Sequence, residues 1–289
     1  MVCKNESLTN IDYSAYCAPN ATFNVTYADV GPHVSLKTIH FTPDEKTRNP
    51  KVLFIAGWIT HIQSWQAVLI EMTRTYEVIY LETREKISSS VRGKVPFTIE
   101  ALGTDIINYV RGAFQPEEDY IIFASSLGAT LALECAHLLN PKPKALILVA
   151  PNALFRVPWV MKLFVTLVHP DLYTMARPVI KQYLKHFRLN TDKDLVQYHK
   201  YCRALDNADP KKLKKAAKAF WNYSVWHRLP EMDVPTLVVG ASKDKLHDPE
   251  NLVQITQNLP NATYLDLGTN TKTHEADVVL AMHSYLNKL

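Results

Sequence analysis

The chain has 289 residues, of which 47% are hydrophobic and 21% are charged. This composition excludes an intrinsically disordered chain, and a count of only 8 glycines excludes collagen-like and glycine-rich architectures. Lys and Arg number 32 and Asp and Glu number 28, so the net charge is only +4 and argues against a nucleic-acid-binding protein. The densest basic run, Lys211 to Lys218, is interleaved with apolar residues at helical spacing. It predicts an amphipathic helix with a solvated face, and contact with anionic lipid or an acidic partner is the alternative.

Short apolar runs alternate with helical patterns along the chain, which predicts an α/β fold with a mostly parallel sheet covered by helices. The predicted strands are residues 22–28, 34–41, 51–56, 77–81, 120–124, 145–150, 236–239 and 262–267. The predicted helices are residues 64–73, 98–114, 129–139, 249–257 and 276–286. The polar stretch 82–93 is predicted to be a loop, and Thr98 is predicted to cap the helix that follows it.

The strand pattern stops after residue 151 and returns after residue 232. An interruption of about 80 residues with helical patterns usually packs as a small cap or lid. We therefore predict a core in two parts, residues 1–151 and 233–289, with a helical cap at residues 152–232. Most aromatic side chains of the cap are expected to form its core, and a few are expected to line an apolar pocket.

The segment from Ile121 to Ala129 reads as a buried strand, then Ala-Ser-Ser-Leu-Gly, then a helix. This order is typical of a nucleophile elbow, a sharp strand-to-helix turn that projects a serine hydroxyl above the sheet. The residues two before and two after the nucleophile must be small, and Ala124 and Gly128 meet that need around Ser126. Ser125 is then expected to be a small packing residue.

Three further features follow the ends of predicted strands. Two of them, an Asp and a His, come after Ser126 in the chain order that a serine triad needs. Asp244 follows one late strand and His274 follows the last strand. In an open α/β sheet, the carboxyl ends of the strands are where ligands bind. Upstream, Gly57 and Trp58 end the first buried strand, so the Trp58 and Leu127 N–H groups are predicted to form an oxyanion hole.

With these features the chain resembles the capped α/β-hydrolase-fold serine hydrolases, esterase- and lipase-like proteins, over residues 22–289. The resemblance implies a triad of Ser126, Asp244 and His274, in which His274 is the general base and Asp244 orients it. Two departures from the family pattern stand out. Ala56 precedes Gly57 where the family has His, and the loop from Gly268 to His274 is longer than usual.

Other residues compete for the same roles. His247 and His283 are rivals for the base, but His247 precedes a helix and His283 lies within one. Asp248 is the rival acid, and its place before Pro249 is typical of a helix N-cap. Asp266, within the last strand, is expected to be structural.

These patterns predict a serine hydrolase that cleaves a carboxylic ester or thioester through an acyl-enzyme. The alternatives are related serine-triad chemistry, namely C–C bond hydrolysis, acyl transfer or perhydrolysis, and a non-catalytic ligand-binding protein of this fold. We expect a small-molecule acyl or ester substrate, no cofactor, no metal and no nucleic acid. The patterns do not indicate an oligomeric state.

The location of the protein is predicted from its first residues and its cysteines. The N-terminal residues lack the apolar stretch of a secretory signal, and no segment is apolar and long enough to be an integral membrane span. Cys3, Cys17, Cys135 and Cys202 fit neither a zinc site nor a dense disulfide framework. We therefore expect a cytoplasmic protein, in which contact with a membrane would be peripheral.

Overall fold

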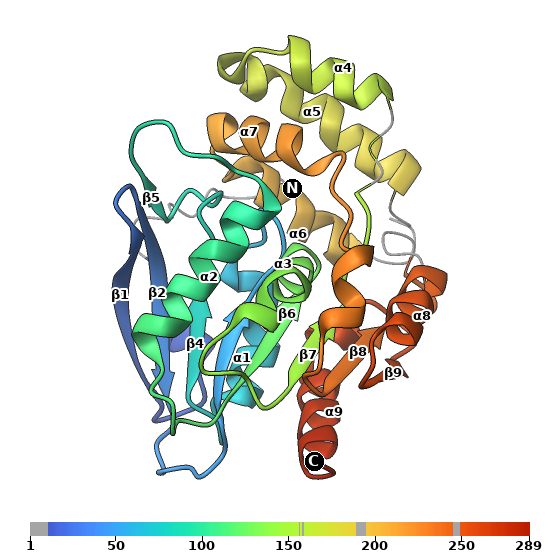
Figure 1. The fold of residues 1–289 in the computed structure, drawn as a ribbon. Helices are drawn as coiled ribbons and strands as arrows, with labels where there is room; N and C mark the ends of the chain where they lie inside the picture. The colour runs from blue at the N-terminus through green and yellow to red at the C-terminus, as the bar shows by residue number, and fades with distance from the viewer. Residues whose placement is uncertain (1–10, 156, 158, 189–194, 245–248) are drawn as a thin grey trace.

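A computed structural model describes residues 11–155, 157, 159–188, 195–244 and 249–289. Its centre is a sheet in the order β1-β2-β4-β3-β6-β7-β8-β9, with β5 paired to β2 (Figure 1). The first two strands pair antiparallel and β2 pairs antiparallel with β4, whereas every neighbour from β4 to β9 is parallel. The strands are β1 (Thr22–Gly31), β2 (Val34–Thr42), β3 (Lys51–Ile55), β4 (Val78–Leu81), β5 (Ser90–Val91), β6 (Tyr120–Ser125), β7 (Leu146–Val149), β8 (Thr236–Gly240) and β9 (Ala262–Asp266).

Helices cover both faces of the sheet, which confirms the predicted α/β class. Side chains of α2, α3 and α8 pack in the core on one face, and those of η2, α1 and α9 pack in the core on the other. Strands β6, β7 and β8 are buried along their whole length because helices cover both of their sides. The helices of this part are η2 (Tyr13–Tyr16), η3 (Ile62–Trp65), α1 (Gln66–Met72), α2 (Ile99–Ala113), α3 (Leu127–Cys135), η4 (Ala136–Leu138), α8 (Pro249–Asn258), η8 (Lys272–His274) and α9 (Ala276–Leu286), where η marks a 3-10 helix.

The predicted elements all occur, with boundaries that differ by a few residues. The helix predicted at 64–73 begins as the 3-10 turn η3 and becomes α1 at Gln66. The helix predicted at 129–139 begins earlier, at Leu127, because the turn at Ser126 leads directly into it. The side chain of Thr98 accepts a hydrogen bond from the Ala101 N–H, which confirms it as the N-cap of α2.

The stretch between β7 and β8 is helical in its described residues, and its only β-pairing there is one bridge between Leu154 and Ser224. Its elements are α4 (Trp159–Leu167), η5 (Pro170–Leu172), α5 (Tyr173–Tyr183), the π-helix η6 (Leu184–Arg188), α6 (Leu195–Asp206), α7 (Pro210–Phe220) and the 3-10 helix η7 (Trp226–Glu231). The end of this stretch joins the main core, because Ala216, Phe220 and Leu229 pack within it. We keep the name cap for residues 152–232, and its boundaries remain a prediction.

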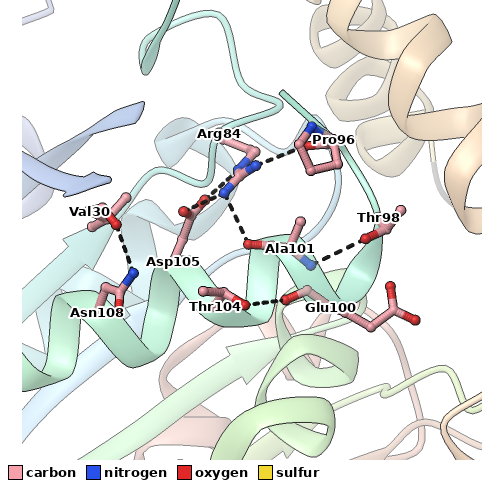
Figure 2. A network of polar contacts seen from close by, with 9 residues as sticks. All are labelled: Val30, Arg84, Pro96, Thr98, Glu100, Ala101, Thr104, Asp105 and Asn108. Atoms are coloured by element: carbon pink, nitrogen blue, oxygen red, sulfur yellow. Dashed lines mark hydrogen bonds and ion pairs between the residues drawn. The ribbon is translucent and has the colours of Figure 1, made fainter. Parts of the chain in front are cut away.

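The loop after β4 is more buried than its polar sequence suggests. Residues 82–86 are all buried although four of the five are charged, and Ser90 and Val91 form the short strand β5. Figure 2 shows how α2 anchors this loop: the Arg84 guanidinium donates to both carboxylate oxygens of Asp105, at 2.5 Å each, and to the carbonyls of Pro96 and Ala101. A buried cation is tolerated only when it is paired and hydrogen-bonded in this way. The loop after β4 is therefore held by a structural ion pair.

Two further sequence expectations concern cysteines and membrane spans. Cys17 and Cys135 carry buried free thiols and Cys202 is also buried, whereas Cys3 lies outside the described residues. Among the helices that the structure describes, none has both the length and the apolarity to cross a bilayer.

Candidate active site

Ser126 lies in a strained turn between the central strand β6 and helix α3. Its backbone has φ 48° and ψ −113°, a conformation that non-glycine residues rarely adopt. The turn is possible because residue 128 has no side chain: a Cβ there would overlap the carbonyl oxygen of Ile55 and lie 2.9 Å from that of Ala56. The strain thus projects one serine hydroxyl above the end of the sheet.

Backbone strain gathers at this edge of the sheet. Of the four described non-glycine residues with positive φ, three follow the carboxyl ends of neighbouring strands: Ile59 after β3, Ser126 after β6 and Ala150 after β7. Such conformations cost about 1–3 kcal/mol each and cluster where a function requires them. The carboxyl edge of the sheet is therefore the candidate active site.

The loop after β3 lies directly against the elbow. A Cβ on Gly57 would come within 3.2 Å of the Ser126 Cβ, so the absence of a side chain lets the loop approach the serine. Among the described residues, no acceptor takes a hydrogen bond from the backbone N–H of Trp58 or of Leu127. These are the two groups predicted to form the oxyanion hole, and both are available to a ligand.

Asn152, which the sequence reasoning missed, contacts the Ser126 hydroxyl. Its side-chain Nδ2 donates to Ser126 Oγ at 3.2 Å. The backbone of Asn152 is fixed in turn by Thr130, whose Oγ1 donates to the Asn152 carbonyl at 2.8 Å. Because Asn152 follows β7, the neighbour of β6, its position after a strand end was the only sequence signal that could have found it.

His274 ends the short helix η8, and its imidazole is held on two sides. The ring stacks on the buried Trp65 indole, with centroids 4.2 Å apart and planes 22° apart. Its Nδ1 lies 3.0 Å from the backbone carbonyl of Asn270 and 3.0 Å from Thr273 Oγ1. A carbonyl oxygen only accepts, so this contact assigns the proton to Nδ1 and leaves Nε2 as the basic nitrogen.

Asp244 lies on the loop after β8 and contacts Asn270, the residue whose carbonyl lies against His274. The Asn270 Nδ2 donates to Asp244 Oδ2 at 2.9 Å, so Asn270 bridges the predicted acid and the predicted base through its side chain and its carbonyl. Sequence reasoning missed this residue as well. The longer loop from Gly268 to His274 supplies it.

The rival residues have other surroundings where the structure describes them. Asp266 accepts from the N–H groups of Ser242 and Gly268, at 2.8 and 2.7 Å, so it holds two loops together as a structural residue. His283 lies on α9, where its Nδ1 is 2.8 Å from the Tyr76 hydroxyl. His247 and Asp248 lie outside the described residues.

A pocket joins this edge to the cap. Its walls come from the loop after β3, from α6 of the cap and from the His274 loop, and it contains about 380 Å³ of empty space, part of it open to solvent. The lining residues are Trp58, Thr60, Ser64, Lys200, Tyr201, Ala204, Asn270 and His274. Trp58 also contacts the cap directly, because its ring meets Phe220 of α7 edge-on at 5.6 Å. A ligand in the pocket would touch both His274 and the cap.

Buried charges lie in the loop after β4. Lys86 Nζ is 3.8 Å from Glu82 Oε2, and both side chains are buried. Burial lowers the pKa of His61 and raises the pKa of Glu85. Lys212 of α7 donates to the carbonyls of Lys86 and Ser89, at 2.7 and 2.6 Å, and burial lowers its pKa. The cap is therefore fastened to the core through this loop.

The comparisons with known proteins agree with the fold. A family model described as serine aminopeptidase, S33, matches residues 51–267. No protein with a curated description matches the chain in sequence. Among solved structures, a hydrolase from Pseudomonas aeruginosa is 17% identical with a TM-score of 0.72, covering 92% of this chain and 97% of that one.

Two further solved structures are similar to the same degree. A thermophilic esterase from Thermogutta terrifontis is 19% identical with a TM-score of 0.71, covering 93% of this chain and 98% of that one. An enol-lactonase from Burkholderia xenovorans is 17% identical with a TM-score of 0.72, covering 91% of this chain and 100% of that one. At these identities the likeness shows the fold, which is that of the α/β-hydrolases.

Proposed function

Because the chain belongs to the serine aminopeptidase S33 family of α/β-hydrolases, we propose that it is a serine hydrolase that cleaves a carboxylic ester or thioester. The observation that carries the proposal is the strained Ser126, set against the Gly57 loop at the sheet edge that also carries Asp244 and His274. An esterase and an enol-lactonase are among the similar structures, and so are a bromoperoxidase and a deformylase, so the ester assignment is the part of the proposal that the experiments below must test.

The proposed reaction begins with attack of Ser126 Oγ on the acyl carbon of the substrate. Nε2 of His274 takes the hydroxyl proton, and the tetrahedral intermediate carries its negative charge on the former carbonyl oxygen. The N–H groups of Trp58 and Leu127 donate to that oxygen. Removing one such donor would slow the reaction by about 100- to 1,000-fold. The C–O or C–S bond then breaks, and the leaving group receives the proton from His274.

Water completes the cycle by attacking the acyl-enzyme. His274 Nε2 takes one proton from the water and returns it to Ser126 Oγ as the acid product leaves. While the imidazole is charged, Asp244 stabilises it, and the Asn270 side chain holds that carboxylate in place. We propose that α6 of the cap, which supplies one wall of the pocket, acts as the lid over the acyl group.

Asn152 has a positioning role in this scheme. Its amide donates to Ser126 Oγ, so Asn152 occupies one side of that oxygen and the proposed base must receive the hydroxyl hydrogen on another. In Asn152→Ala we expect kcat to fall by about tenfold, because one neutral hydrogen bond contributes about 0.5–1.5 kcal/mol, while KM stays unchanged. Steady-state kinetics on a p-nitrophenyl ester measures both constants. An unchanged kcat, with or without a raised KM, would show that Asn152 does not position Ser126 in the proposed reaction.

Active-site labelling tests the proposed function directly. The native protein is treated with a fluorophosphonate probe, digested, and its labelled peptide is identified by mass spectrometry. We expect one label, on Ser126, and hydrolysis of p-nitrophenyl esters or acyl thioesters of some chain length. Labelling of another residue, or none, contradicts the serine hydrolase. Faster cleavage of an aminoacyl p-nitroanilide than of every ester would retain the nucleophile but contradict the ester assignment.

A further inference from the structure

The outer helices of the cap expose a cluster of apolar side chains. Of the fifteen large hydrophobic side chains that the described residues expose, seven fall between residues 159 and 179, where they are 49–76% exposed. They are Trp159, Val160, Leu163, Leu167, Leu172, Met175 and Val179, and we call them the apolar face. Trp159 is 74% exposed, so it is not one of the cap aromatics that form a core.

The spacing of these residues places them on one side of each helix. In α4, residues 159, 160, 163 and 167 follow the helical repeat, and residues 172, 175 and 179 do so from η5 into α5. Both helices lie at the end of the molecule opposite the C-terminal helix α9 (Figure 1). Soluble proteins rarely expose so many large apolar side chains on neighbouring stretches of chain unless they bind something.

The charge of the cap indicates the kind of partner. Residues 152–232 contain fifteen Lys and Arg against six Asp and Glu, a net +9, so the rest of the chain, with a total of +4, carries −5. Helices α4 and α5 contain no acidic residue, and Lys211, Lys215 and Lys218 of α7 are exposed. A second copy of this chain would bring two positive caps together, whereas an anionic surface would attract the cap.

We propose that the apolar face docks the cap on an anionic phospholipid membrane. Trp159, Leu167 and Met175, the most exposed of the seven, enter the interfacial region, and exposed basic residues of the cap contact the lipid headgroups. Docking would hold the pocket, one wall of which is α6 of the cap, close to the lipid. On the premise of the proposed function, the substrate is then an acyl ester that partitions into the membrane.

Vesicle flotation with the full chain tests the docking without relying on activity. We expect at least tenfold stronger binding to vesicles of phosphatidylcholine with phosphatidylglycerol than to vesicles of phosphatidylcholine alone, and weaker binding as salt is raised. The triple variant W159S/L167S/M175S should lose at least tenfold in binding. The matched control L138S/L280S, which removes two exposed leucines from other surfaces, should bind as the native protein does.

The same variants separate the possible outcomes. Equal hydrolysis of a short soluble ester by the native protein and the triple variant would show that the variant is folded. Its weaker vesicle binding would then result from the changed side chains of the apolar face. Vesicle binding without any hydrolysis would support docking while contradicting the proposed function. Absence of native binding, or a native dimer that the triple variant converts to a monomer, would overturn the proposal.

Discussion

Ser126→Ala is expected to lower kcat/KM for the best ester substrate by about a thousandfold or more. The substitution removes Oγ, the atom that forms the acyl-enzyme, and leaves the backbone of the elbow in place. Rate enhancement would persist only from substrate binding and from the N–H groups of Trp58 and Leu127. Steady-state kinetics over the ester panel measures the loss, and the fluorophosphonate label should disappear in the same variant.

Ser125→Ala is the matched control for this experiment. Ser125 is the adjacent residue, it ends β6, and it is buried, whereas the strained backbone belongs to Ser126. We expect Ser125→Ala to retain kcat/KM within about threefold, a change of about 0.7 kcal/mol or less, because the Ser125 hydroxyl takes no part in the proposed reaction. Full turnover in Ser126→Ala, or a comparable loss in Ser125→Ala, would show that Ser126 is not the nucleophile.

The fold and the elbow could be predicted because their signals are local. Buried parallel strands are continuous apolar runs, and the elbow needs small residues at fixed positions before and after one serine. Each pattern can therefore be recognised within about ten residues of sequence. The order of the strands then brings the ends of β3, β6, β8 and β9 to one edge. The structure places Ser126, Asp244 and His274 at that edge, and their catalytic roles stay predictions.

The contacts that sequence reasoning missed depend on residues that are far apart in the chain. Asn152 is identified by its contact with Ser126, 26 positions earlier, and Asn270 by its contacts with Asp244 and His274. No local pattern distinguishes either from a loop asparagine that faces water. In the same way, the charges between Glu82 and Lys86 predict a solvated loop until Arg84 is seen paired with Asp105.

Trp159 is an exception to the expectation that most aromatic side chains of the cap are buried. An aromatic residue at helical spacing favours a buried position, because burial of a large ring is the common outcome in a globular protein. The side chain instead remains exposed, as do Leu167 and Met175 on the same face. A pattern of apolar residues predicts that a helix has an apolar side, but it does not say whether protein or lipid covers that side.

Gly128→Ala is the substitution for which we expect the largest loss of stability. The added Cβ would overlap the Ile55 carbonyl oxygen and lie 2.8 Å from the Ile55 carbonyl carbon and 2.9 Å from the Ala56 oxygen. These atoms end β3, which is fixed by hydrogen bonding to β4 and β6, so they have little room to move. Overpacking of this kind costs about 1–3 kcal/mol, and more when the neighbour is rigid backbone.

The same substitution should impair catalysis in the molecules that fold. Relief of the overlap must separate α3 from the end of β3, which moves the Leu127 N–H and Ser126 away from the Gly57–Trp58 loop. A displacement of 1 Å at such a site lowers the rate by about a hundredfold, so we expect a loss of that size in kcat. Thermal and guanidinium unfolding measure the stability, and kinetics at a temperature well below the transition measures the rate.

Gly112→Ala distinguishes this explanation from a general effect of replacing glycine. Gly112 lies in α2, and no heavy atom comes within 4 Å of where its Cβ would be. Alanine favours a helix over glycine by about 1 kcal/mol, so this variant should be as stable as the native protein or more stable, with unchanged kcat. If Gly128→Ala behaved like Gly112→Ala, the close approach of α3 to β3 would not be what holds the elbow, and the assignment of Ser126 to a strained turn would lose its physical basis.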